Sequence, residues 1–448
     1  MTPSEPPPEP FVVPADSQTA PEPVGAEELK LRYFWRNLTA NLLAEVGWGF
    51  GWATCSLVTV LPVFLRKLGA EAQVIGLLPA ISMLGFAALQ LPASYFVAPF
   101  HRKKNAFILA HIPAALSWLP LALVTLALAG SRPRAAMVAF LILYAAFALA
   151  MGPVLPMWSD FLNRLLPAQR RGRAWGLITA AGCTAGVGAA VVIARVVGTW
   201  QFPRDYAFCF LLTFISFSLG TAVLVWVHEP VISQPRRREL PREFLTGLWR
   251  ALADNRDFRS FLLARALMAF GGMAVAFYAV YAVDVVKAPE RAVGVFTGFA
   301  LAAQTVSSLF WGWLGDKRGY LLTALAAGVP KLLATALALL APSYLSFVIV
   351  FVLTGLAFSG EWLSLLNLTI ELCPQEDKTT HVSLATTLLA PASAAAPLLG
   401  GLIVAHFSYQ VLFAASLAAQ VCGLVALAVT VREPRTLRPA ARLGLPRP

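Results

Sequence analysis

The fold of this chain is decided by a short charged stretch, Gly312-Trp313-Leu314-Gly315-Asp316-Lys317-Arg318-Gly319, which joins two apolar segments, residues 293–314 and 320–341. An α-helix needs about 20 residues to cross a hydrocarbon core of about 30 Å, and both segments are that long. The glycines allow a tight reversal, and the charged side chains favour water. The stretch therefore predicts two membrane-spanning helices that meet at one membrane surface.

The composition extends this pattern to the whole chain of 448 residues. Hydrophobic residues make up 58% and charged residues 13%, against about 45–50% and about 25% in soluble domains. Too few polar side chains remain to cover a water-facing surface, which excludes an ordinary soluble enzyme, a disordered protein and a secreted disulfide scaffold. The net charge of +12 is then expected to set orientation in a membrane rather than nucleic-acid binding.

Ten further apolar segments bring the total to twelve. Helices are expected rather than strands, because every backbone polar group in lipid has to be satisfied within its own segment. The sequence therefore predicts an all-α membrane protein with twelve transmembrane helices. The expected spans are 38–64, 74–98, 106–129, 135–158, 174–197, 206–228, 260–284, 293–314, 320–341, 344–370, 381–405 and 408–431.

Polar stretches divide the chain into five parts. Residues 1–28 hold eight prolines and six acidic residues, which predicts a disordered cytoplasmic tail. A six-helix bundle over 29–228 precedes a linker, 229–259, whose apolar residues recur at helical spacing opposite basic ones and predict an amphipathic helix on the membrane surface. A second six-helix bundle covers 260–431, and residues 432–448 form a second cytoplasmic tail.

The lysines and arginines are distributed unevenly between the two expected membrane surfaces. Of the 35, 25 lie in the tails, loops and linker expected on the inner side, 7 lie in outer loops, and 3 lie within spans. Membrane proteins concentrate lysine and arginine on the cytoplasmic side. We therefore expect a multi-pass protein of the cell membrane with both termini in the cytoplasm.

In its loops and layout the chain resembles the major facilitator superfamily. The family's signature loop has a glycine, then an aspartate followed by basic residues and a glycine, as residues 312–319 do. Arg170-Arg171-Gly172-Arg173 after the fourth segment is a second common feature of the family. The arrangement of six helices, a linker and six helices covers about residues 30–435. The resemblance implies two pseudo-repeated bundles and transport by alternating access around a central site.

Two departures from the family pattern matter. The corresponding first-half loop, residues 98–105, keeps its basic residues but has lost the aspartate and the glycines. The fifth segment lacks the Gly-Pro and Gly-Gly ending associated with drug antiporters. A similar ending, residues 396–401, occurs in the eleventh segment, where we interpret it as helix packing. The family therefore implies transport but not a substrate.

The charged loops are candidates for a cytoplasmic gate. Asp316 stands at a helix end, where it can accept hydrogen bonds or pair with an arginine and so hold the two halves together in one state. The alternatives are a solvated loop that only fixes topology and, for the arginines, contact with lipid headgroups. The candidate gate residues are Gly312, Asp316, Lys317, Arg318, Gly319, Arg171 and Arg173.

Ionisable side chains inside spans need a reason, because each costs at least about 2.5–3.5 kcal/mol on insertion scales. Asn41, Glu45 and Trp52 lie on one face of the first segment at helical spacing. Glu361 and Asn367 belong to a second polar stripe on the tenth segment. Both stripes predict helices that line a cavity. Glu45 has no obvious partner, which makes it the first candidate carrier of a proton or cation.

Two oppositely charged residues are expected at the same depth. Lys331 and Glu361 each lie about 15–16 Å from the cytoplasmic ends of neighbouring segments. They can pair as a fixed structural ion pair or as a pair whose partners change with state. Further candidates for contact with a solute are Gln90, Gln304, Tyr278 and Tyr281.

The sequence therefore predicts a secondary active transporter for a small solute, coupled to a proton or ion gradient, with efflux of an amphipathic compound favoured. Uptake of a polar nutrient is the alternative among transporters. A non-transporting membrane sensor or lipid-handling protein is the alternative of another class. The sequence has no nucleotide-binding loop, metal-ligand spacing or catalytic set. We expect no enzyme activity, cofactor, metal or nucleic-acid partner, and a monomer in the lipid bilayer.

Overall fold

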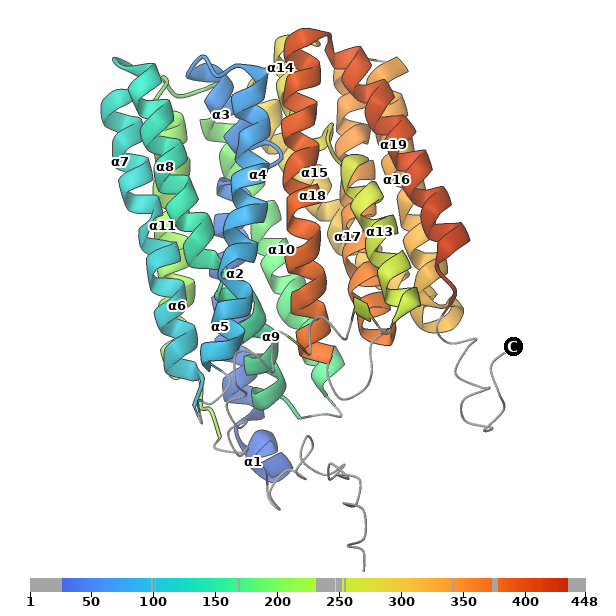
Figure 1. Cartoon of the computed structure of the whole chain (residues 1–448). Helices are drawn as coiled ribbons and strands as arrows, with labels where there is room; N and C mark the ends of the chain where they lie inside the picture. Colours follow the sequence, from blue (N-terminus) through green and yellow to red (C-terminus); the bar gives the residue numbers. More distant parts are fainter. Residues whose placement is uncertain are drawn as a thin grey trace, which may run out of the picture.

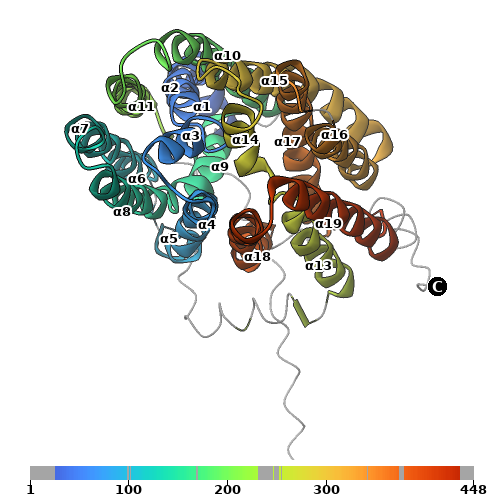
Figure 2. The same ribbon diagram turned by 90° about the horizontal axis from the view of Figure 1, so that it is seen from above.

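The computed structural model describes residues 26–97, 100, 102–167, 170–230, 246, 252–253, 255–340, 342–372 and 378–433. Within these residues every regular element is helical. Figure 1 shows the long helices standing side by side in one bundle. Seen from above in Figure 2, the first-half helices gather on one side and the second-half helices on the other. The predicted all-α membrane fold of two halves is confirmed.

The first half of the chain, blue to green in Figure 1, contributes eleven α-helices and one short 3-10 helix among the described residues. Two of these helices follow each other closely and together form one span, Lys104–Leu128. The elements are α1 (Ala26–Arg32), α2 (Phe34–Thr54), α3 (Val60–Lys67), α4 (Ala72–Ala88), α5 (Gln90–Val97), α6 (Lys104–Leu116), α7 (Trp118–Leu128), α8 (Pro133–Met151), α9 (Val154–Leu165), α10 (Arg171–Val196), α11 (Arg204–Val223) and η1 (Leu224–Trp226).

The second half, yellow to red, repeats the plan with longer continuous helices. Its first span, Arg256–Asp284, is divided into three helical pieces. The elements are α13 (Arg256–Phe270), η2 (Val275–Phe277), α14 (Tyr278–Asp284), α15 (Ala292–Arg318), α16 (Tyr320–Leu340), α17 (Tyr344–Leu372), α18 (Lys378–His406) and α19 (Tyr409–Thr430).

Ten stretches among the described residues are long and apolar enough to cross a membrane. The other two expected segments, 38–64 and 74–98, each consist of two helices with a break between them. In the first of them α2 ends where the Thr54 hydroxyl donates to the carbonyl oxygen of Gly51, at 3.0 Å. Pro62, in the first turn of α3, has no N–H with which to continue the helix from the preceding residues.

Three of the expected parts fall wholly or largely outside the described residues. These are residues 1–25 of the first tail, most of the linker 229–259 with its amphipathic helix, and residues 434–448 of the second tail. Residues 26–28, assigned to the tail from the sequence, form the beginning of α1. The predicted linker helix therefore stays a prediction.

The end of the first half is fastened to α2 by His228 and its neighbours. Asn37 exchanges two hydrogen bonds of 2.9 Å with the backbone of His228, whose ring stacks on Tyr33 at 3.8 Å between centroids. Burial, and then the positive charges of Arg36 and Lys104, lower the pKa of His228. Its ring is therefore neutral at pH 7 and can stack without a charge to solvate.

A glutamate then closes the first half. The sequence 227–230 reads Val-His-Glu-Pro, and the Glu229 carboxylate accepts hydrogen bonds from the backbone N–H groups of Lys103 at 3.0 Å and Lys104 at 2.8 Å. These donors belong to the first turn of α6, which has no internal partners for them. A negative charge at this position also interacts favourably with the helix dipole.

The second half closes in the same way. The sequence 431–434 reads Val-Arg-Glu-Pro, and the Glu433 carboxylate accepts a hydrogen bond of 3.1 Å from the backbone N–H of Leu321, in the first turn of α16. Gly319 has a φ of +91°, and a Cβ there would lie 2.5 Å from the same carboxylate. The glycine before α16 is therefore required by both its backbone angle and the space that Glu433 occupies.

The halves touch each other backbone to backbone along α4 with α18 and along α10 with α15. A Cβ on Gly76 of α4 would lie 2.2 Å from the carbonyl oxygen of Pro397 on α18. A Cβ on Gly294 of α15 would lie 2.2 Å from the backbone nitrogen of Ala194 on α10. Small residues allow this close approach of helices. The packing interpretation of residues 396–401 is confirmed.

The closing glutamates lead to a first prediction. Replacing Glu229 by alanine leaves two backbone donors of α6 without their partners, so we expect a loss of about 1–2 kcal/mol of stability. The measurement is the midpoint temperature of unfolding in detergent. Glu71→Ala is the matched control, because Glu71 stands at the N-cap of α4 without a capping hydrogen bond. Equal midpoints for the two variants would contradict the capping role.

Candidate functional site

Four ionisable side chains occupy one layer in the middle of the bundle. We call them the charged layer: Glu45 on α2, Arg265 on α13, Lys331 on α16 and Glu361 on α17. We call the surface at which α2 begins and α19 ends the terminal face, and the surface that carries α3 and α14 the opposite face (Figure 1). Each of the four lies nine to eleven residues from the end of its helix at the terminal face, which is about 14–17 Å.

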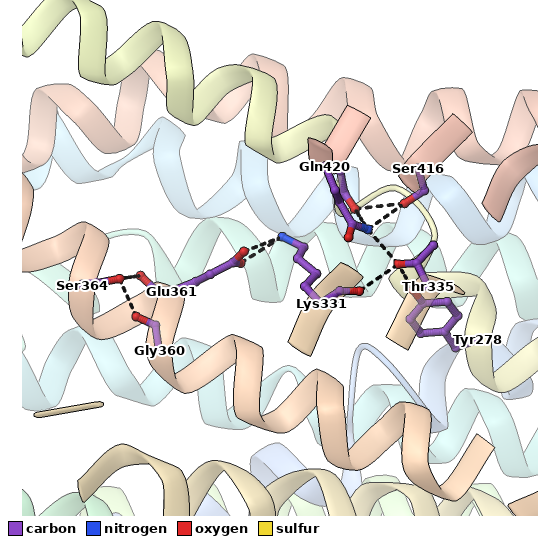
Figure 3. Close-up of polar contacts among 9 residues, drawn as sticks. Tyr278, Lys331, Thr335, Gly360, Glu361, Ser364, Ser416 and Gln420 are labelled. Atoms are coloured by element: carbon purple, nitrogen blue, oxygen red, sulfur yellow. Dashed lines mark hydrogen bonds and ion pairs between the residues drawn. The ribbon is translucent and has the colours of Figure 1, made fainter. Parts of the chain in front are cut away.

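Lys331 and Glu361 form an ion pair within this layer. The Lys331 Nζ atom lies 3.0 Å from Oε1 and 2.9 Å from Oε2 of Glu361. Both side chains are 18% exposed. Figure 3 shows Lys331 extending from its helix toward the Glu361 carboxylate on the next one. Each charge thus has the partner that a buried charge requires.

Arg265 approaches the same carboxylate from a third helix. Its guanidinium interacts electrostatically with Glu361, and Nη1 donates a long hydrogen bond of 3.4 Å to the hydroxyl of Thr369. The Phe261 ring centroid lies 5.6 Å from its Cζ atom. In the described part of the chain this is the only hydrogen bond of Arg265. Two cations thus share one carboxylate.

A hydroxyl group ties the Lys331 helix to its neighbours (Figure 3). The Thr335 hydroxyl donates to the carbonyl oxygen of Lys331 at 3.1 Å and lies 2.7 Å from both the Tyr278 hydroxyl and Nε2 of Gln420. Because the Thr335 hydroxyl already donates its proton, it accepts hydrogen bonds from Tyr278 and Gln420. One donated and two accepted hydrogen bonds are all that a hydroxyl can make. Thr335 therefore connects α16 to α14 and α19 one turn from the ion pair.

The same group of side chains satisfies a break in the first span of the second half. The carbonyl oxygen of Gly271, just after α13 ends, accepts hydrogen bonds from Ser416 at 3.0 Å and Gln420 at 2.7 Å. In a membrane a broken helix is stable only when neighbours satisfy the freed backbone groups. A Cβ on Gly272 would lie 4.0 Å from the Lys331 Nζ atom. The break therefore lies directly beside the ion pair.

Glu45 stands apart from these groups, on the first half. It is partly exposed and lies against α10, where a Cβ on Gly182 would be 2.8 Å from its Cγ atom. Cys183 is the neighbouring titratable group. Glu45 makes no hydrogen bond or ion pair with the residues that the structure describes. No set of three possible metal ligands gathers among those residues either.

An aromatic surface lies two turns along α2 from Glu45. Trp52 is 38% exposed, and its ring centroid lies 5.5 Å from Phe217, 5.8 Å from Phe147, and 6.4 Å from both Trp48 and Phe86. These neighbours hold the indole ring in place while part of it stays open. A fixed, partly open aromatic ring can contact the apolar part of a solute.

Ion pairs join the two halves at the opposite face. Arg66 of α3 and Asp284 of α14 approach to 2.5 Å, and Lys67 and Glu290 also approach to 2.5 Å. Each pair connects a residue of the first half to a residue of the second. Both pairs lie at one end of the bundle.

A buried hydroxyl pair lies just below these ion pairs. The Thr59 and Thr297 hydroxyls are 2.6 Å apart, and both side chains are buried. Thr59 belongs to the first half and Thr297 to the second. The opposite face is therefore closed by polar contacts between the halves.

Sequence comparison identifies the family. The profile of the Major Facilitator Superfamily matches residues 40–292 and 282–448. This chain belongs to the major facilitator superfamily. The match covers the charged layer and both halves of the bundle, so the identification made from the sequence is confirmed. No curated protein matches the chain.

Solved structures of superfamily transporters have the same fold. A D-xylose-proton symporter gives a TM-score of 0.70 at 15% identity, covering 90% of this chain and 99% of its own. A nucleoside transporter with one substitution gives 0.68 at 16% identity, covering 89% and 100%. The human organic anion transporter MFSD10 gives 0.62 at 14% identity, covering 88% and 99%. At these identities the likeness shows the fold alone.

On this superfamily fold, several of the expected cavity residues are buried. Asn41 donates to the carbonyl oxygen of Asn37, four residues earlier, at 2.8 Å. Tyr278 is held by Thr335, and Tyr281 is packed among aromatic rings. In the described state these side chains contact other parts of the protein, and their contact with a solute stays a prediction. Gln90 is buried as well.

Two other expected cavity residues stay partly exposed. The Asn367 amide donates to the carbonyl oxygen of Leu363 at 2.7 Å and keeps some exposed surface. Gln304 is partly exposed on α15, where Ser307 donates to its carbonyl oxygen at 3.3 Å. Contact of either residue with a solute stays a prediction.

Two of the expected gate residues of the second half each have a contact within that half. Asp316 accepts a hydrogen bond of 2.9 Å from the Tyr320 hydroxyl. The Lys317 Nζ atom lies 5.3 Å from the Trp313 ring centroid. Gly312 and Arg318 belong to the end of α15, and Gly319 caps it, whereas Arg171 and Arg173 begin α10 in the first half.

Sequence reasoning did not single out several residues that the structure brings together at the charged layer and the broken helix. Arg265 is one of the three basic residues within the expected spans, but no polar stripe on segment 260–284 distinguishes it. Thr335, Ser416 and Gln420 are single polar residues in apolar segments, and only the broken helix explains them. The Gly271-Gly272 pair is the one sequence signal for that break.

The sharing of Glu361 leads to a second prediction. Glu361→Gln leaves Lys331 and Arg265 as two cations without a carboxylate, whereas Lys331→Gln leaves Glu361 beside Arg265. We expect the first variant to lose more stability, by about 1–3 kcal/mol. The measurement is the midpoint temperature of both variants in the same detergent. A larger loss for Lys331→Gln would show that Arg265 does not compensate Glu361.

Proposed function

We propose that this protein is a secondary transporter that moves a small solute across the cell membrane by alternating access. The observation that carries the proposal is the set of contacts that joins its halves at the opposite face. Two ion pairs and a hydroxyl pair connect them at the opposite face, while both halves supply charges at mid-depth. Rocking of two bundles about a central site is a common mechanism of secondary transporters.

We further propose that the terminal face is cytoplasmic. The concentration of lysine and arginine in the segments at that face supports this orientation. The described state is then closed toward the outside. In the opposite state the terminal face closes, and there we assign the gate to Asp316, Lys317 and Arg318 of the second half with Arg171 and Arg173 of the first.

Glu45 is our candidate for the coupling proton. Its carboxylate has no counter-ion in the described part of the chain, so adding a proton changes its charge without breaking an ion pair. Lys331 and Glu361, in contrast, neutralise each other. A group that gains and loses charge inside the bundle can bias which state is more stable.

The solute that we favour is amphipathic, and we favour export of it. The partly open ring of Trp52 offers an apolar surface about 10 Å from the Glu45 position along α2. A solute with a large apolar part can cross a bilayer without a protein, so a coupled transporter serves chiefly to expel it. We also propose that the protein transports its solute without catalysing a reaction and that it acts as a monomer.

The contacts at the opposite face lead to a third prediction. The variant Asp284→Asn with Glu290→Gln removes both ion pairs between the halves. Each partly exposed pair contributes about 0.2–1 kcal/mol, so we expect about a fivefold shift toward the state open at that face. The readout is labelling of Thr297→Cys, in a background without native cysteines, by a membrane-impermeant maleimide added outside intact cells.

The labelling has its own control. Glu71→Gln removes a charge at the same face without breaking an ion pair between the halves, and we expect its labelling rate to equal that of the parent. An unchanged rate in the double variant would argue against the ion pairs as a closure. Labelling of Thr297→Cys only from the inside would reverse the proposed orientation.

Coupling at Glu45 gives a fourth prediction. Glutamine keeps the shape of glutamate but cannot change charge. The labelling rate of Thr297→Cys is divided at each pH, between about pH 5.5 and about pH 8, by the rate of the same maleimide with a free thiol, because only the thiolate reacts. Glu45→Gln is expected to abolish the pH dependence of this normalised rate. The parent and Glu71→Gln are expected to keep that dependence. If Glu45→Gln responds to pH as the parent does, the coupling group lies elsewhere.

A further inference from the structure

We propose that Arg265 binds the negatively charged group of the transported solute, and that the solute class is therefore an amphipathic organic anion. This inference rests on the proposed transport function and adds the chemistry of its substrate. It starts from a guanidinium at mid-depth in the bundle that the protein itself leaves largely without partners.

The hydrogen bonds of Arg265 are few for its position. A guanidinium carries five N–H donors. In the described part of the chain one of them is used, in a 3.4 Å contact from Nη1 to the Thr369 hydroxyl. A charged group inside a membrane normally has its donors satisfied, because an unsatisfied one is costly. The remaining donors are therefore available to a ligand.

The charges around Arg265 also leave it under-neutralised. Glu361 interacts with Arg265 electrostatically, but both of its carboxylate oxygens lie 2.9–3.0 Å from the Lys331 Nζ atom. Two cations and one carboxylate give this wall of the second half a formal charge of about +1. An anionic group on the solute would bring the wall to neutrality.

Lys331 is a poorer candidate for the same role. Its ammonium is held by Glu361, and the next turn of its helix is fixed through Thr335 to Tyr278 and Gln420 (Figure 3). Arg265 has no such network. A guanidinium is also planar, and it can bind a carboxylate through two parallel hydrogen bonds.

The surroundings of Arg265 fit a ligand with an apolar part. The Phe261 ring lies beside its guanidinium, at 5.6 Å from Cζ to the ring centroid. Trp52 presents a partly open ring on the first half. A neutral or cationic solute would leave the positive wall unpaired. The charge distribution on the second half therefore favours anions among amphipathic compounds.

The rival explanation is that Arg265 only supports Glu361 as a second counter-ion. In that case binding of a solute would not depend on the solute's charge. Both roles place Arg265 near Glu361, so loss of stability in a variant cannot separate them. Binding that depends on the charge of the solute separates the two roles.

The experiment measures binding to the purified full-length protein in detergent. The probes are radiolabelled benzoate, with benzenesulfonate as a second aromatic anion and benzamide as the neutral analogue of benzoate. We expect saturable binding of the anions and none of benzamide. Arg265→Gln should weaken benzoate binding about tenfold or more, as expected for loss of a charge-assisted hydrogen bond.

Two further variants control this result. Arg265→Lys keeps the charge but not the planar pair of donors, and we expect it to bind benzoate with intermediate affinity. Arg195→Gln removes an exposed arginine in the last turn of α10, at the opposite face. We expect this variant to bind benzoate with unchanged affinity. Midpoint temperatures of all variants establish that they are folded.

The outcomes separate this inference from the function on which it rests. Binding of neither anion, or benzoate binding that is equal in the parent and in folded Arg265→Gln, would overturn the anion role. Flux of uridine or xylose into proteoliposomes that is indifferent to Arg265→Gln would also overturn it while supporting transport. Anion binding that depends on Arg265 without any benzoate flux in proteoliposomes would support the site and refute the transport function.

Discussion

A charge in hydrocarbon needs a partner, and this constraint shapes the middle of the molecule. Glu361 is the only carboxylate of the second half at the level of the charged layer among the described residues, and it faces two cations. The ion pair takes up one of them. What remains is a positive wall on the second half and a separate carboxylate, Glu45, on the first. Charge separated between two bundles makes their relative position sensitive to what binds between them.

The backbone obeys the same rule as the side chains. A continuous helix satisfies its own polar groups, and the break after Gly271 exposes a carbonyl oxygen that no helical N–H reaches. Ser416 and Gln420 supply the missing donors, and Thr335 connects them to the helix that carries Lys331. The irregular backbone and the charged pair are therefore parts of one hydrogen-bonded assembly, so neither is expected to move without the other.

Periodicity, length and charge sorting predicted the helical fold, its two halves and the depth of Lys331 and Glu361. They did not predict the interruptions near Thr54 and Gly271, because local side-chain hydrogen bonds decide these and hydropathy does not register them. Asn41 and Tyr278 matched a cavity-lining pattern but are buried, since a polar face can also serve contacts between helices. The single hydrogen bond of Arg265 and its interaction with Glu361 could be recognised only from the three-dimensional structure.

The glycine contacts between the halves also bear on motion. Gly76 against Pro397 and Gly294 against Ala194 bring main chain directly onto main chain, and both lie toward the opposite face. Helices in such close backbone contact can rotate slightly against each other without a side chain having to leave a pocket on the neighbouring helix. A Cβ atom at either glycine would push the two helices apart and so hinder this rotation.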